Sequence, residues 1–187
     1  MHVDVKAVLF DNDGTLVNTY WAITTSFKLT MLKIMGERNP DISSYVKLIG
    51  LPLADQFTYY SEDPKVQKLM LDDYRTYNEK LNLDKVDTFW GLPEALKSLH
   101  DAGIFLGVVT SKMHRTCEAN LEANNIRQYF SYIQGLEDSE IHKPQPGALT
   151  HACKAINLDP SEVLYVGDSI YDLQSARGAG CKTCGVT

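Results

Sequence analysis

Short apolar runs that stop at polar or acidic residues constrain the fold of this chain more than any other feature. They occur at 5–10 (VKAVLF), 104–109 (IFLGVV), 163–166 (VLYV) and 181–186, with a weaker candidate at 132–134. Short, nearly continuous apolar runs of this kind are typical of strands buried on both faces of a parallel sheet. The pattern therefore predicts a sheet whose strands end in polar loops.

Helical patterns lie between these runs from about residue 90 onward. Apolar residues at 92, 95, 96 and 99 keep a 3.6-residue period, with Pro93 near the start and Gly103 past the end, as is typical of a helix. A second helical stripe extends from Ala148 to Ile156. Helices that alternate with buried strands favour an α/β fold, here a doubly wound parallel sheet of the Rossmann-like kind with helices on both faces.

Residues 17–87 follow a different pattern, because no strand-like run interrupts their helical periodicity. Two apolar stripes are present, one at Ile23, Phe27, Met31 and Ile34 and one at Val66, Leu69, Tyr77 and Leu81. We therefore predict a helical cap domain at 17–87, inserted after the first strand. Residues 1–16 and 88–187 together would form the α/β core.

Composition limits the classes of partner. Hydrophobic residues make up 44% of the 187 residues and charged residues 22%, which excludes a mainly disordered chain. The net charge of −6 provides no overall basic field for nucleic acid or an anionic membrane. No apolar run approaches the roughly 20 residues that span a bilayer, and the first residues lack a secretion signal. We expect a cytoplasmic protein that binds neither nucleic acid nor membrane; the oligomeric state is left open.

A pair of aspartates follows the first apolar run directly, in the segment Asp11-Asn12-Asp13-Gly14-Thr15. Carboxylates two residues apart at a strand end can face one site, and the glycine permits a tight backbone turn. One carboxylate could then act as a nucleophile and the other as an acid or base. The alternative is an Asp-Gly hairpin turn, although the residues after Thr15 have helical rather than strand character.

A second acidic cluster, Asp168 and Asp172, follows the run at 163–166. In isolation it could be a helix N-terminus, with Asp168 as the N-cap and Asp172 one turn later. In an open parallel sheet, however, ligands bind beyond the carboxyl ends of the strands, where both acidic clusters would lie. Oxygen ligands from Asp11, Asp13 and Asp168, completed by water, suit a hard cation such as Mg²⁺.

Two further segments could contribute to the same site. Thr110 and Ser111 end the run at 104–109 and could alternatively cap the next helix, while Lys143 could be a solvated loop residue. Considered with the acidic clusters, they match what a phosphoryl group needs, which is a nucleophile, a metal, hydroxyl donors and a cation. We therefore predict that Thr110, Ser111 and Lys143 bind the phosphate of a small phosphorylated metabolite.

In chain order, these segments resemble the four motifs of the haloacid dehalogenase superfamily of hydrolases, in the subgroup with a helical cap after the first motif. They stand at Asp11 to Thr15, at Thr110, at Lys143 and at Asp168 with Asp172. The resemblance extends over nearly the whole chain. It implies the α/β core and helical cap described above, and it implies that Thr110 and Lys143 hold the phosphoryl oxygens.

The resemblance also implies how the acidic residues act. Asp11 becomes an aspartyl-phosphate, and Asp13 protonates the leaving group and then activates water. Mg²⁺ is bound by Asp11, by the main-chain carbonyl of Asp13 and by Asp168, with Asp172 and Gly14 in supporting positions. The acid at position 13 implies phosphatase or phosphomutase chemistry, because superfamily members that cleave carbon–halogen or carbon–phosphorus bonds lack it.

Within the phosphatases, the segments VVTSK at 108–112, HKPQP at 142–146 and VGDSIYDLQSARGAG at 166–180 resemble phosphoglycolate phosphatase and its pyrophosphatase relatives. Two features depart from that pattern. Asn18 replaces the usual acidic residue after DGTLV, and the chain ends at Thr187 where relatives usually continue. We therefore expect a truncated C-terminus that leaves a sheet edge or an apolar face uncovered.

The expected function is a Mg²⁺-dependent phosphatase that acts on a small phosphomonoester such as phosphoglycolate, with the cap as a lid that selects small substrates. A sugar phosphomutase of the β-phosphoglucomutase kind, or a pyrophosphatase, would use the same core. A phospho-accepting signalling or regulatory domain is the alternative from another class. Such a domain needs neither an insert of about 70 residues nor a second acid beside the nucleophile.

Overall fold

The structure is a computed structural model that describes residues 5–84 and 86–187. Its elements in chain order are β1 (Ala7–Phe10), α1 (Tyr20–Thr30), a π-helical turn η1 (Met31–Met35), α2 (Ile42–Val46), α3 (Leu53–Thr58), α4 (Pro64–Asp84), α5 (Leu92–Asp101), β2 (Phe105–Val109), α6 (His114–Ala123), β3 (Tyr132–Gln134), α7 (Gly147–Ala155), β4 (Val163–Gly167), α8 (Ile170–Ala179) and β5 (Lys182–Gly185), with short 3-10 turns η2 (Arg127–Tyr129), η3 (Leu136–Asp138) and η4 (Pro160–Glu162). The predicted alternation of strands and helices after residue 90 is confirmed.

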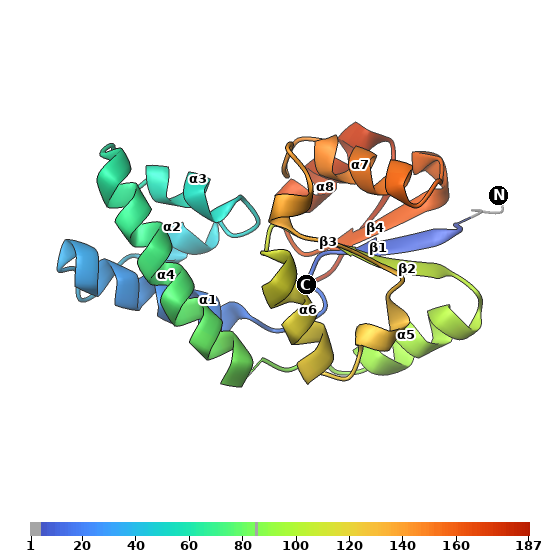
Figure 1. Ribbon diagram of the computed structural model, residues 1–187, viewed down its shortest axis with the longest axis horizontal. Helices are drawn as coiled ribbons and strands as arrows, with labels where there is room; N and C mark the ends of the chain where they lie inside the picture. Colours follow the sequence, from blue (N-terminus) through green and yellow to red (C-terminus); the bar gives the residue numbers. More distant parts are fainter. Residues whose placement is uncertain (1–4, 85) are drawn as a thin grey trace.

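Five parallel strands form one sheet in the order β3-β2-β1-β4-β5. The chain builds the sheet outward from β1 to β3, and then returns to the other side of β1 to add β4 and β5 (Figure 1). The order of the strands therefore reverses beside β1. In parallel sheets, the crevice beyond the carboxyl ends of the strands at such a switch point is where ligands bind.

Helices cover both faces of the sheet, with α5 and α6 on one side and α7 and α8 on the other (Figure 1). Side chains of β1 alternate between these layers. Ala7 and Leu9 pack in one buried cluster with residues of α7 and α8, and Val8 and Phe10 pack in another with residues of α5 and α6. The α/β fold with a doubly wound parallel sheet is thus confirmed.

Helices α1 to α4 pack on one another around a third buried cluster that includes Phe27, Tyr45, Phe57 and Met70. The rings of Phe27 and Tyr45 stack with centroids 3.8 Å apart. Figure 1 shows these helices together at one end of the molecule. We call residues 17–87 the helical insert. Among the described residues, no helix has both the length and the apolar character that crossing a membrane requires.

The two chain segments that enter and leave the helical insert run side by side. Val17 forms an antiparallel bridge with Thr88, and the backbone N–H of Asn18 donates to the carbonyl of Asp87 at 2.9 Å. The Asn18 side chain is exposed. This pairing closes the insert at its base, so that its four helices leave and rejoin the sheet at one place.

One residue of the predicted apolar stripe on α4 is exposed, whereas the other three are partly buried. Leu69 is 57% exposed, whereas Met70 and Tyr74 are 0% and 6% exposed and face the other helices of the insert. The chain has three apolar residues in succession at 69–71, and helical periodicity alone did not show which of them faces inward. Packing against Phe57 of α3 selects Met70 and Tyr74.

This difference gives a matched pair of stability variants. Met70→Ala removes a fully buried side chain of α4 and leaves a cavity, so we expect it to lower the free energy of unfolding by about 2–5 kcal/mol. Leu69→Ala removes an exposed side chain and is expected to change it by less than about 0.5 kcal/mol. Urea unfolding followed by circular dichroism measures both, and equal losses would contradict the assignment of the buried face of α4.

Candidate active site

The segment after β1 places Asp11 and Asp13 on one side and Asn12 on the other. Asn12 is fully buried, and its side-chain amide lies 3.5 Å from the Asn120 side chain of α6. The backbone carbonyl of Asn12 accepts hydrogen bonds from the N–H groups of residues 16 and 17, and these bonds close the turn around Gly14. The chain then enters α1 at Tyr20, so the alternative of a hairpin between two strands is wrong.

Lys143 is buried beside Asp11, so the alternative of a solvated loop lysine is wrong. Its Nζ lies 3.0 Å from Asp11 Oδ1 and 2.6 Å from Asp172 Oδ1, and it donates to the Tyr165 hydroxyl at 3.1 Å. Burial alone would lower the pKa of the Lys143 ammonium, but the two carboxylates outweigh it and raise the pKa well above its ordinary value. Lys143 is therefore a charged group in the interior.

Asp172 is held in place by the first turn of α8. Ser169 is the N-cap of this helix, and its hydroxyl and backbone N–H donate to Asp172 Oδ2 at 2.5 and 3.0 Å. Burial would raise the pKa of Asp172, but Lys143 and Ser169 together lower it. The alternative that Asp168 caps this helix is wrong, because Ser169 occupies that position. Asp168 remains open to a ligand.

Asp11, Asp168 and Asp172 bring carboxylate oxygens within 4.8 Å of one another, and among the described residues this is the one cluster with metal-ligand spacing. Burial raises the pKa of Asp11 to about 7, with Lys143 opposing the rise and neighbouring carboxylates adding to it. Partial burial likewise raises the pKa of Asp168 to about 6, and the negative charge of Asp172 adds to the rise. Crowded oxygen ligands with uncompensated negative charge fit a hard divalent cation.

Thr110 and Ser111 lie at the carboxyl end of β2. The Thr110 backbone N–H donates to the Gln134 carbonyl at 3.0 Å, and its Oγ1 accepts the N–H of Lys112 at 3.2 Å. The Ser111 hydroxyl donates to the carbonyl of Gly50 in the helical insert at 3.1 Å. Neither caps α6, whose N-cap is Met113, so the helix-cap alternative is wrong.

Sequence reasoning missed two residues of this region. Lys112 places its Nζ 2.9 Å from Asp13 Oδ1 and 3.3 Å from Asp13 Oδ2. The Tyr165 hydroxyl donates to the Val109 carbonyl at 2.7 Å and contacts Lys143. Lys112 could have been found from its place directly after Thr110 and Ser111. Tyr165 could have been found as the polar residue in an otherwise aliphatic strand.

A cavity of about 290 Å³ lies between the strand ends and the helical insert. The core lines it with polar residues that include Asp11, Asp13, Thr110, Lys112 and Asp168. The insert lines it with a largely apolar set that includes Ile23, Tyr45, Ile49, Leu51, Leu53 and Tyr74, together with Arg75, Asn78 and Glu79. Lys143 is not part of this wall and lies behind Asp11.

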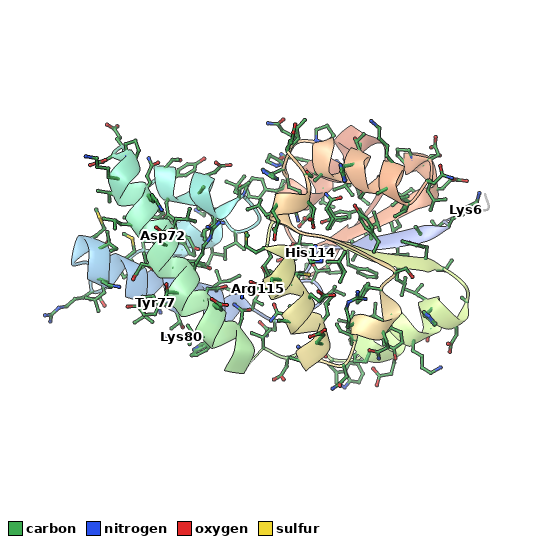
Figure 2. All side chains as sticks on the ribbon, in the orientation of Figure 1. Lys6, Asp72, Tyr77, Lys80, His114 and Arg115 are labelled. Atoms are coloured by element: carbon green, nitrogen blue, oxygen red, sulfur yellow. The ribbon has the colours of Figure 1, made fainter. Side chains whose placement is uncertain are left out.

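The helical insert touches the core at the side of this cavity. Figure 2 shows Arg115 of α6 directed toward α4, where its guanidinium forms an ion pair with Glu79. Tyr171 of α8 donates its hydroxyl to the carbonyl of Lys47 in the insert at 3.0 Å. With the Ser111 contact to Gly50, these bonds hold the insert against the strand ends.

The model of the haloacid dehalogenase-like hydrolase family matches residues 8–186. The chain belongs to this family. A relative from Clostridium perfringens, which carries the provisional name pyrophosphatase PpaX, is 39% identical over 182 residues, covering 97% of this chain and 84% of that protein. Pyrophosphatase PpaX of Bacillus pumilus is 34% identical over 183 residues, covering 97% and 83%.

Solved structures of the family share the fold. A haloacid dehalogenase-like family protein of Streptococcus pneumoniae superposes with a TM-score of 0.86 at 25% identity, covering 98% of this chain and 85% of that one. A predicted phosphoglycolate phosphatase from Haemophilus somnus gives a TM-score of 0.88 at 24% identity, covering 100% and 87%, and this similarity shows the fold alone. The protein is thus a haloacid dehalogenase-like hydrolase, with relatives that are named phosphatases.

The turn of this hydrolase beside Asp168 needs a residue without a Cβ atom, which Gly14 provides. It has a φ of +77°, and a Cβ at this position would lie 2.2 Å from Asp168 Oδ2. We expect Gly14→Ala to displace Asp168 and to lower hydrolase activity about tenfold or more, in addition to its backbone strain.

Gly103→Ala is the control for that strain, because Gly103 has a φ of +75° with no atom within 4 Å of the added Cβ. This variant should lose about 1 kcal/mol of stability and keep its activity. Thermal unfolding and steady-state kinetics of both variants test the argument. Equal activity in the two would show that a Cβ added at Gly14 does not disturb the site.

Proposed function

We propose that this hydrolase is a Mg²⁺-dependent phosphatase that cleaves a small phosphorylated metabolite through an aspartyl-phosphate on Asp11. The observation that supports the proposal is the environment of Asp11, a carboxylate at the end of β1 that lines the cavity with Asp168 and has Lys143 behind it. In this proposal residues 1–16 and 88–187 are the catalytic core, and 17–87 are a cap domain. Phosphatase names among the relatives agree with this reaction class.

In the proposed reaction, Asp11 attacks the phosphorus atom and a bond forms between its carboxylate oxygen and the phosphoryl group. Lys143 stays charged behind Asp11 and offsets the negative charge that remains there. Thr110 would supply a hydroxyl donor for a phosphoryl oxygen. Ser111 would do so only by exchanging its bond to the Gly50 carbonyl for one to the phosphate. Donors that are already in position when charge develops lower the barrier without a cost in reorganisation.

Asp13 would move the protons. It lines the same cavity as Asp11 from two residues further along the turn. As the ester bond breaks, Asp13 donates a proton to the leaving oxygen, and it then takes a proton from the water that hydrolyses the aspartyl-phosphate. The family match, which includes Asp13, supports this role. The role requires that the Asp13 carboxylate face the leaving group.

Asp11, Asp168 and the main-chain carbonyl of Asp13 would hold Mg²⁺, with Asp172 and Gly14 in support. The metal would supply Lewis-acid stabilisation of the phosphoryl oxygens when bound. Asp172 shares its Oδ1 with Lys143 and its Oδ2 with Ser169, so its role in the proposal is to orient those groups beside the metal.

The cavity volume supports a small-molecule substrate. At about 290 Å³ it lies at the lower end of the range of roughly 300–1,000 Å³ that is usual for small-molecule pockets. The helical insert lines one side of it, the position that a lid excluding water and bulky phosphoesters would occupy. A phosphomonoester such as phosphoglycolate is our first candidate.

Pyrophosphate is the second candidate, because the PpaX relatives that are 31–39% identical carry that activity in their names. The wall of the cavity also holds three basic side chains, Lys112, Arg75 and Arg115, that could contact a second phosphate. A sugar phosphomutase differs only in the acceptor of the phosphoryl group, so product analysis separates it from either hydrolase.

The nucleophile is tested with Asp11→Asn. The substitution keeps the shape of the side chain, but an amide cannot form the acyl phosphate, so kcat should fall by about 10³-fold or more. Kinetics on a panel containing phosphoglycolate, pyrophosphate and sugar phosphates measure this. Retention of a tenth of the wild-type kcat by a correctly folded variant would exclude Asp11 as the nucleophile.

The metal is tested by chelation and by Asp168→Asn. Activity should disappear after dialysis against a chelator and return on addition of Mg²⁺. Loss of one charged ligand should raise the Mg²⁺ concentration for half-maximal activity by about tenfold or more. Calorimetric titration of Mg²⁺ into the metal-free protein gives an independent reading, and full activity after chelation would disprove the metal requirement.

A further inference from the structure

We infer that Lys112 is a positioning residue for Asp13. We also infer that Asn82 of the helical insert makes the orientation of Asp13 depend on docking of the insert on the core. The inference deepens the proposed function and rests on it, because it concerns the carboxylate that would move protons. It is carried by a contact of three side chains, in which the Lys112 ammonium lies between Asp13 and Asn82.

The first step is the contact between Lys112 and Asp13. The Lys112 Nζ lies 2.9 and 3.3 Å from the two carboxylate oxygens, and the side chains of Lys112 and Asp13 are only 7% and 19% exposed. An exposed ion pair contributes little to orientation, whereas a charged hydrogen bond shielded from water is stronger and directional. The ammonium thus restrains the direction in which the Asp13 carboxylate faces.

The second step is the orientation of Asn82, on the last turns of α4. Its Nδ2 donates to the Asn78 carbonyl at 2.9 Å and to Asn78 Oδ1 at 2.7 Å, so the amide cannot be reversed without losing both bonds. Its Oδ1 is therefore the atom that faces Lys112, at 3.3 Å from the Nζ. Asn82 is 2% exposed, so this acceptor is not a solvated surface group.

The third step joins core and insert. Lys112 follows β2 in the core, while Asn82 belongs to the insert, so their contact exists only when α4 lies against the start of α6. With the insert undocked, the Lys112 ammonium would lose the acceptor on one side and would restrain Asp13 less. The orientation of the proton-transferring carboxylate of Asp13 then depends on docking of the insert.

Lys112 also lines the cavity, so direct contact with the substrate is the competing role. The two roles differ in kinetics. A residue that binds the substrate affects KM or all leaving groups alike, whereas a residue that positions an acid affects mainly kcat for leaving groups that need a proton. A series of substituted phenyl phosphates provides leaving groups of similar size and different basicity.

The central experiment is Lys112→Met, a change that keeps the length of the side chain and removes the charge. We expect kcat to fall about 10- to 100-fold for phenyl phosphate and less than about threefold for 4-nitrophenyl phosphate, with KM changed less than about threefold. In an Asp13→Asn background, the same substitution should lower kcat by no more than a further factor of about three, because the two residues act as a unit.

Asn82→Ala tests the contribution of the insert. It should lower kcat in the same leaving-group-dependent way by about three- to tenfold, and it should have no further effect in the Lys112→Met background. Lys80→Met is the matched control, since Lys80 is an exposed lysine on the same helix (Figure 2). It should change neither kcat nor its dependence on the leaving group.

Each of these measurements either supports or overturns the inference. An equal loss on all leaving groups, a raised KM alone, or additive losses in the double variants would overturn the inference and leave the proposed function intact. If Lys112→Met does not fold, the Asn82→Ala and Asp13→Asn cycle decides by the same criterion. A wild-type protein that turns over no phosphate ester with Mg²⁺ would instead overturn the proposed function, and the inference with it.

Discussion

Compensation of crowded negative charge is the constraint on which the rest of this structure depends. Four carboxylates, at Asp11, Asp13, Asp168 and Asp172, meet two ammonium groups at the ends of three neighbouring strands. With all groups ionised, the site retains two negative charges. Burial is the largest cause of the raised pKa values of Asp11 and Asp168, and the neighbouring carboxylates add to the rise. A divalent cation would balance it, and a phosphate could then enter a site that no longer repels it.

The parallel sheet makes this concentration of charge possible. Strands β1, β2 and β4 lie side by side with their carboxyl ends together, so the segments after residues 10, 109 and 167 converge although they are far apart in the chain. A packed core on both faces of the sheet holds the strands in register. The free energy from burying apolar surface therefore supports a polar edge that would not be stable by itself.

Much of this arrangement could be predicted from the sequence, since it depends on local pattern. The apolar runs located the strands, and the polar residues that end them located Asp11, Thr110 and Asp168. Contacts between distant elements could not be predicted in this way. The place of Lys112 directly after Ser111 puts it near the site, but its partners, Asp13 of one loop and Asn82 of a helix in the insert, could not be predicted from local pattern. Burial of Lys143 likewise depends on β4, α8 and the end of β1 coming together.

The two lysines contact different parts of the site. Lys143 is 3% exposed and pairs with Asp11 and Asp172, which like Lys143 belong to the core. Asp13 and Lys112 lie on the wall that faces the insert. In the proposal, the core residues around Lys143 would carry out phosphoryl transfer, and Asp13, whose partner Lys112 contacts Asn82 of the insert, would carry out proton transfer. We therefore expect the proton step to depend on whether the insert is docked, through the contact of Lys112 with Asn82.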